Sequence, residues 1–227
     1  PLPIYWVTIK LKRSVVVILL CSSTLLYGCL EQSQQNDPIA VLLDYPIAYV
    51  KRPIPVNNQG NPTSINLLDL EDFNPGADLY LRDRASPSAP ERNITFRFTG
   101  GLGDIKDVES SADGSKLVFA MRAPEIENAD EQPTWNIWQY EISSDSLTRI
   151  ISSDITAEAG QDIAPHYLPD GRIVFTSTRQ RDAGAILLDE GKPRFSAETE
   201  SRNGPAFVLH VMDGDGNSIK QISFNKA

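Results

Sequence analysis

The sequence is poor in the side chains that most often carry catalysis or bind metals. It contains only two cysteines and two histidines among 227 residues. It has no His-Glu-x-x-His pair of a zinc hydrolase, no Gly-x-Ser-x-Gly turn of a serine hydrolase and no Gly-x-x-x-x-Gly-Lys phosphate loop. A Cys-x-x-Cys-His motif for covalent haem attachment is also missing. These residues therefore predict no catalytic residue, no metal site and no cofactor, and whether the whole protein is an enzyme stays open.

Basic side chains are outnumbered by acidic ones. The formal net charge is −9, and the first 28 residues carry three basic residues and no acidic one, so the charge without them is −12. A body this acidic disfavours binding to nucleic acid or to an anionic membrane through bulk charge. We therefore expect no nucleic-acid partner.

The longest uncharged apolar run, 14–27, is shorter than the about 20 apolar residues that a membrane-spanning helix needs. It follows the basic residues Lys10, Lys12 and Arg13, and this order is typical of a secretory signal peptide. We therefore predict a signal peptide over residues 1–28. Because the chain begins with proline, residues 1–6 could precede the natural start.

The end of this run, Leu26-Tyr27-Gly28-Cys29, resembles the bacterial lipobox. The resemblance implies cleavage after Gly28 and diacylation of Cys29, which would anchor the exported chain, since two acyl chains hold a protein on a membrane stably. Tyr27 departs from the small residue usual there. Leu30, rather than aspartate, implies by the same resemblance the periplasmic side of the outer membrane. The alternative is an ordinary signal peptide or short anchor with an incidental cysteine.

Cleavage and lipidation would leave no free thiol. Cys21 would leave with the signal peptide and Cys29 would carry the lipid. Stability would then come from core packing without a disulfide. Residues 29–45 are predicted to be the lipidated cysteine and a flexible tether, because 30–38 are polar and contain no aromatic residue.

From Pro46 onward, short apolar runs of the β type alternate with Gly, Pro, Asn and Asp, and helical periodicity is nearly absent. This pattern predicts an all-β fold: a sandwich, a barrel or a propeller. The strand candidates are 47–50, 78–81, 93–96, 117–120, 136–140, 172–175 and 207–211.

An internal repeat favours the propeller. Residues 107–122 and 162–179 both run from an aspartate through Asp-Gly to an aliphatic strand with phenylalanine and then arginine. Each is followed by a strand, a polar turn and a short strand, in 135–150 and 207–222. Asp-Gly pairs suit tight hairpins because such turns need residues with positive φ. The repeat period is that of one supersecondary unit.

This repeat resembles the TolB-type propeller repeat, whose hallmark is a Ser-Pro-Asp-Gly-like turn before an aliphatic-Phe strand. Residues 168–171, Leu-Pro-Asp-Gly, match it well, whereas 111–114 lack the proline. The resemblance covers about 100–224 and implies two blades of four-stranded antiparallel sheet in 100–227. We expect a weaker first blade in 46–99.

The first blade would have strands at 46–52, 78–83 and 91–98. About three blades make only a partial propeller, because known propellers have about four to eight. We therefore expect further blades beyond Ala227. A sandwich with accidental similarity is the alternative.

Candidate site residues recur within the blades. Asp107 and Asp162 take equivalent places in the repeat, where they could bind a cation or a partner's amines in the channel or cap a turn through backbone N–H groups. His166, at the turn that begins a blade, could line the channel. Arg122 and Arg179 also recur and could pair with these acids between blades.

Other polar features are assigned structural roles. His210 lies between apolar neighbours in a strand, and Asp213–Asn217 is predicted to be a hairpin turn, since the later positions of a calcium loop do not fit. The longest insertion, 182–205, with the shorter 128–134 and 57–66, would form part of a binding face.

The leading functional hypothesis is a lipid-anchored envelope propeller that acts as a scaffold for a protein partner. A second resemblance, of Ala48–Pro53 followed by Asp78–Leu81 to proteins related to the hydrazine synthase alpha subunit, leads to an alternative. The chain would then belong to a larger periplasmic enzyme, c-type haem or prolyl-oligopeptidase-like, with its catalytic domain beyond residue 227. A third hypothesis is a sensor of a small ligand or cation.

Overall fold

The computed structural model describes residues 45–64, 70–180, 185, 188–191, 198, 199 and 204–224. All of them belong to one compact unit, Leu43–Ala227. The predicted signal peptide and Cys29 lie outside the described residues, as does much of the 182–205 insertion. Within the described ranges, no helix has both the length and the apolar character to span a membrane.

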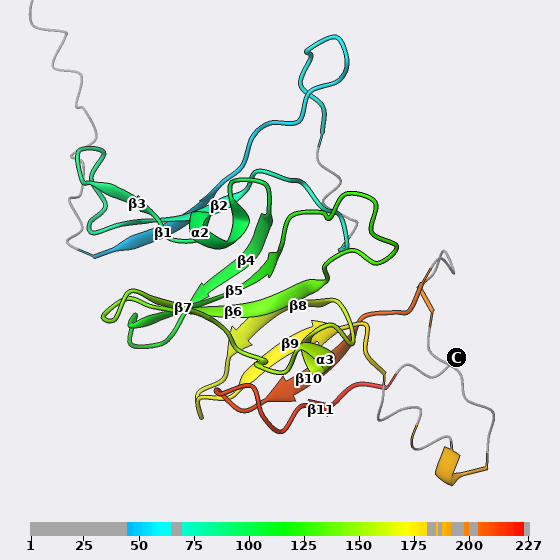
Figure 1. The fold of residues 1–227 in the computed structure, drawn as a ribbon. Coiled ribbons are helices and arrows are strands. Elements are labelled where there is room, and N and C mark those ends of the chain that lie inside the picture. Colours follow the sequence, from blue (N-terminus) through cyan, green and yellow to red (C-terminus); the bar gives the residue numbers. More distant parts are fainter. Residues whose placement is uncertain are drawn as a thin grey trace, which may run out of the picture. The chain divides into compact units, whose positions relative to one another are not determined.

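The described residues form an all-β fold, as the sequence predicts. Three antiparallel sheets account for the strands, and the described helical residues are those of two labelled one-turn helices together with 185, 188 and 189 (Figure 1). The first sheet has the order β1-β2-β3, with bounds β1 (Ile47–Lys51), β2 (Asp78–Arg82) and β3 (Glu91–Asn93).

The second and third sheets are four-stranded meanders in which each strand pairs with the next one in sequence. The second sheet contains β4 (Asp104–Ser110), β5 (Lys116–Arg122), β6 (Trp135–Glu141) and β7 (Ser146–Arg149). The third sheet contains β8 (Asp162–Tyr167), β9 (Ile173–Ser177), β10 (Val208–Met212) and β11 (Lys220–Gln221). The two units of the sequence repeat are therefore two sheets of the same topology.

The repeated Asp-Gly pairs form equivalent hairpins. Gly114 joins β4 to β5 with φ +70°, and Gly171 joins β8 to β9 with φ +86°, values that residues with a Cβ rarely adopt. The N–H of each glycine donates to the carbonyl oxygen three residues earlier, at 2.9 Å in both turns. The tight-turn role that the sequence assigns to these pairs is confirmed.

Equivalent bulges correct one detail of the predicted alignment. The pairing shifts between Lys106 and Glu109 in β4 and between Ile163 and His166 in β8. The bulge contains Asp107, with φ +57°, in β4 and Ala164, with φ +50°, in β8. The structural equivalent of Asp107 is therefore Ala164, and its predicted equivalence to Asp162 is wrong.

The last strand of the first sheet is shorter than the predicted range of 91–98. In the structure it ends at Asn93, and Phe96–Thr99 forms the helix α2 instead. The side chain of Asn93 accepts hydrogen bonds from the N–H groups of Thr95 and Phe96 at 3.1 and 3.0 Å, which turns the chain away from the sheet. Among the described residues this sheet therefore has three strands, where a blade has four.

The second sheet is buried on both faces. Phe119 of β5 packs in a core cluster with Leu79 and Leu81 of the first sheet. The next residue back, Val118, points to the opposite face and packs in a cluster with Phe175 of the third sheet. Because both faces are apolar, the second sheet lies as a layer between the other two, an arrangement consistent with stacked propeller blades.

Candidate functional site

The first strands of the second and third sheets are joined by side-chain to backbone contacts. Asp107 accepts the backbone N–H of Ala164 through Oδ2 at 3.0 Å, and Glu109 accepts that of Tyr167 through Oε2 at 3.3 Å. Asp107 thus caps a backbone group of the neighbouring sheet rather than its own turn. Glu109, to which the sequence pattern assigns no role, is part of the same contact between the sheets.

His166 lies beside Glu109 on the surface. Its Nδ1 is 2.7 Å from Oε2 of Glu109, and the exposed fractions of the two side chains are 61% and 35%. With Asp107, also exposed, they form a polar group along β4 and β8 that we call the inner edge (Asp107, Glu109 and His166). The structure therefore brings two of the three predicted site residues, Asp107 and His166, onto one surface.

Asp162, the third predicted site residue, does not belong to the inner edge. Its side chain is completely buried and accepts a hydrogen bond from Nη2 of Arg179, which is 4% exposed. A role for Asp162 as a channel acid is therefore contradicted, because nothing outside the protein reaches it. The predicted pairing of Arg179 with one of these acids is present, but it is formed within the β8–β9 hairpin and not between blades.

Arg122 also has partners other than the predicted ones. Its guanidinium lies 3.9 Å from Glu125 and 4.5 Å from the ring centroid of Phe73. Two arginines of the first sheet region do connect it to the second sheet. Arg52, which follows β1, donates to Oδ1 of Asp104 at 2.6 Å, and Arg92 of β3 donates to the hydroxyl of Tyr140 at 3.4 Å.

Burial dominates the electrostatics of Asp162. It raises the pKa of the carboxyl group from 3.8 to about 7, although the charge of Arg179 opposes this shift. The second carboxylate oxygen, Oδ1, has no hydrogen-bond partner among the described residues. Asp162 is therefore held with its charge only partly compensated.

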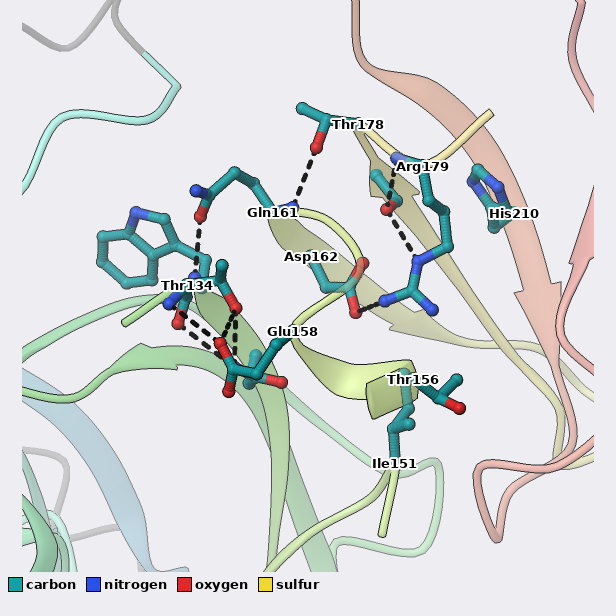
Figure 2. A network of polar contacts seen from close by, with 12 residues as sticks. Thr134, Ile151, Thr156, Glu158, Gln161, Asp162, Thr178, Arg179 and His210 are labelled. Carbon is teal, nitrogen blue, oxygen red and sulfur yellow. Dashed lines mark hydrogen bonds and ion pairs between the residues drawn. The ribbon is translucent and has the colours of Figure 1, made fainter. Parts of the chain in front are cut away.

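A polar network extends from this pair to the second sheet (Figure 2). The hydroxyl of Thr178 accepts the N–H of Gln161 at 2.9 Å, and the side-chain oxygen of Gln161 accepts the N–H of Trp135 at 2.8 Å. Glu158, just after the helix α3 (Asp154–Ala157), accepts the hydroxyl of Thr134 at 2.7 Å. These bonds hold α3 and the third sheet against the second sheet.

A cavity of about 310 Å³ opens beside Arg179. One wall is the segment that includes the start of α3, and the other consists of the third sheet and its β10–β11 hairpin. Most of the side chains that line it are polar and come from four separate segments. They include Ser152, Ser153, Thr156, Arg179, His210 and Gln221.

His210 is 2% exposed and stacks on Phe175, with ring centroids 5.5 Å apart. Its Nδ1 lies 3.0 Å from the carbonyl oxygen of Val208, so that this nitrogen must carry the proton. The sequence predicts a structural histidine here, and the structure adds that its side chain lines the cavity.

Sequence reasoning missed this cavity. It singled out Arg179 as a repeated residue but gave no signal for Ser152, Ser153 or Thr156. The predicted Asp213–Asn217 turn is present, closed by bonds between Asp213 and Asn217 and between Gly216 and Asp213, both 2.9 Å. In the described part of the chain, no three His, Cys, Asp or Glu side chains are close enough to hold a metal ion.

Another cavity, of about 410 Å³, lies between the first and second sheets. Its lining is mainly apolar and includes Ala48, Leu81, Val108 and Ile142. It therefore offers few of the donors that a charged ligand needs.

No model of a protein family matches this chain. No curated protein matches it either. Three solved structures are similar to parts of it. A candidate TolB from Agrobacterium tumefaciens is 22% identical, with a TM-score of 0.37, over 64% of this chain and 40% of that protein. The hydrazine synthase of Kuenenia stuttgartiensis is 15% identical, with a TM-score of 0.39, over 61% of this chain and 18% of that one.

The third structure comes from a study of two prolyl endopeptidases. It is 16% identical, with a TM-score of 0.38, over 92% of this chain and 28% of that protein. The chain thus spans less than half the length of each of these three proteins.

Proposed function

We propose that this chain is the propeller part of an exported lipoprotein that acts as a scaffold for a protein partner in the bacterial envelope. The observation that carries the proposal is the second sheet, a four-stranded meander buried on both faces between two other sheets. Stacked meanders of this kind are the repeating unit of a propeller. The lipid on Cys29 would be the contact with the membrane.

The inner edge is the surface at which the partner would bind. It presents two carboxylates and one imidazole on strands held by a rigid core, and Asp107 and His166 are exposed. Such a surface suits lysine or arginine side chains of the partner, which would approach two acids at once. Because the strands are already rigid, binding would cost them little conformational entropy.

Site-specific photo-cross-linking in Gram-negative cells tests this proposal with the full chain. A photoreactive amino acid would replace Ser110, the exposed last residue of β4, and in a control chain Ser144, exposed in the β6–β7 turn. We expect one defined protein adduct at position 110 and none at 144. Adding Glu109→Gln or His166→Ala should weaken the adduct several-fold.

Two results would contradict the scaffold proposal. One is the absence of a protein adduct at position 110, and the other is the same set of adducts at positions 110 and 144. Circular dichroism of each variant would show whether the fold is intact, so that a lost adduct reports on the surface.

A further inference from the structure

We propose that the cavity beside Arg179 is a binding site for a carboxylate group. This site is separate from the inner edge, and the proposal does not depend on the protein partner. Three features point to such a site: the guanidinium, the lining of the cavity and the size of the cavity.

The guanidinium of Arg179 has donors left over. Its Nε donates to Oγ of Ser177 at 3.0 Å and its Nη2 donates to Asp162. Its Nη1 makes no hydrogen bond to a described residue, and in Figure 2 dashed lines leave only two of the three nitrogens. Because the side chain is 4% exposed and lines the cavity, these N–H groups, which have no partner among the described residues, can be reached through the cavity.

The same contacts hold the guanidinium in place. Ser177 and Asp162 fix two of its nitrogens, and both residues are fully buried. A ligand would therefore meet a donor group that is already oriented. The planar fork of an arginine matches the planar carboxylate in two parallel hydrogen bonds.

The rest of the lining favours an anion with one charge. No carboxylate residue lines the cavity among the described residues, whereas the uncharged polar residues Ser152, Ser153, Thr156 and Gln221 do. The nearby acids, Asp154 in α3 and Glu158 just after it, pair with Arg149 instead. In a chain of net charge −9, this is a local site of positive charge.

Asp162 is paired with the guanidinium and neutralises its positive charge only in part. Burial raises the pKa of its carboxyl group to about 7, which favours the neutral form. A single arginine then has charge to share with one ligand carboxylate. A phosphate dianion would require further cationic groups, which the described lining does not contain.

The size limits the ligand. A volume of about 310 Å³ is at the lower end of the range of ligand pockets. It admits a small organic acid or the last residue of a peptide with its terminal carboxylate. Both sources share the chemistry that Arg179 recognises.

The test is a titration of the purified full chain, followed through the NMR signal of the Arg179 Nε–H group. The probes are acetate, succinate, trialanine with a free carboxylate, trialanine amide and inorganic phosphate. We expect saturable shifts with the carboxylates and none with the amide. Tighter binding of trialanine than of the small acids would identify a peptide end, and the reverse order would identify a free acid.

Variants separate binding from folding. Gln221→Leu and Thr156→Val keep the pair of Arg179 and Asp162 and should weaken carboxylate binding measurably. The double variant Arg179→Gln with Asp162→Asn removes both charges together and should lower the affinity at least about tenfold. Arg172→Gln, which removes an exposed arginine paired with Asp170, should leave the affinity unchanged.

Several outcomes would overturn the proposal. They are no saturable shift with any carboxylate, equal binding of trialanine and its amide, and phosphate binding as tight as that of acetate. The affinity of the double variant for carboxylates is measured by calorimetry. An unchanged affinity in a folded double variant would also overturn the proposal.

Discussion

Arg179 donates through Nη2 to Oδ2 of Asp162, and both side chains are almost entirely buried, with exposed fractions of 4% and 0%. Asp162 begins β8, and Arg179 lies two residues beyond the end of β9, so the pair closes one end of this hairpin. Both charged groups of a buried ion pair lose their hydration. Whether the pair stabilises the fold therefore depends on how completely the two groups are hydrogen-bonded.

The first prediction concerns the pH dependence of stability. Burial raises the pKa of Asp162 from 3.8 to about 7, so between these values the folded chain binds a proton that the unfolded chain releases. Stability from this group is therefore fully present below the unfolded pKa and is lost as the pH rises through the folded one. The slope is at most about 1.4 kcal/mol per pH unit. Urea unfolding at a series of pH values measures it.

Asp162→Asn should flatten this slope between roughly pH 4 and 7, the interval between the two pKa values. Asp113→Asn is the control, because hydrogen bonds from Ser111 and Ser115 lower the pKa of Asp113 to about 2, outside this range. The control should keep the slope of the unmodified chain. If Asp162→Asn keeps it too, Asp162 is ionised throughout and the assigned pKa is wrong.

The second prediction tests the stacking of the sheets. Phe119 and Ile137 are both 0% exposed, and they lie in the clusters shared with the first and the third sheet. Phe119→Ala should lower the free energy of unfolding by about 3–5 kcal/mol and Ile137→Ala by about 2–5 kcal/mol. Ile155→Ala is the control, because Ile155 is 84% exposed.

The control should change stability by less than about 0.5 kcal/mol. If only one of the two core variants is destabilised, one face of the second sheet lies open and the layered packing is wrong. Denaturant unfolding of all three variants decides between these results.

Sequence patterns predicted the architecture well where local chemistry decides it. The Asp-Gly turns at Gly114 and Gly171 became equivalent hairpins, because positive φ is a property of the turn itself. The strand predicted to reach Phe98 failed because the side chain of Asn93 captures two backbone N–H groups and begins a helix. Composition alone does not distinguish these outcomes.

The candidate sites were harder to predict because they depend on long-range packing. Asp107 and Asp162 match in a linear comparison of the two repeats. In the structure, however, the residue that takes the same place in the bulge of β8 as Asp107 does in β4 is Ala164. Arg179 was recognised as a repeated residue that could pair with Asp162, which it does, yet the cavity beside it depends on segments far apart in sequence. Such contacts have no periodicity that a pattern could detect.

A third prediction concerns the anchor. Cys29 lies outside the described residues, so its lipidation is tested chemically. Cells grown with radiolabelled palmitate should label the full chain, and Cys29→Ala should remove the label completely. Cys21→Ala is the matched control and should keep it, because Cys21 belongs to the apolar run of the predicted signal peptide. Label that persists in Cys29→Ala would contradict the lipobox prediction.

The last prediction compares two glycines in equivalent turns. Gly171 and Gly216 have φ values of +86° and +83°, and the N–H of each donates to the carbonyl oxygen three residues earlier at 2.9 Å. A Cβ on Gly171 would meet no heavy atom within 4 Å, whereas one on Gly216 would lie 2.3 Å from the carbonyl oxygen of Ile150. The two positions share their backbone conformation and differ in free space.

Gly171→Ala should therefore cost about 1–2 kcal/mol through backbone conformation alone. Gly216→Ala should cost about 1–3 kcal/mol more, because the hairpin must move away from Ile150. Since Gly216 also lines the cavity beside Arg179, that movement should weaken carboxylate binding, while Gly171→Ala should leave it unchanged. Urea unfolding and the NMR titration measure the two effects, and equal losses of stability would show that the β10–β11 hairpin does not press against the second sheet.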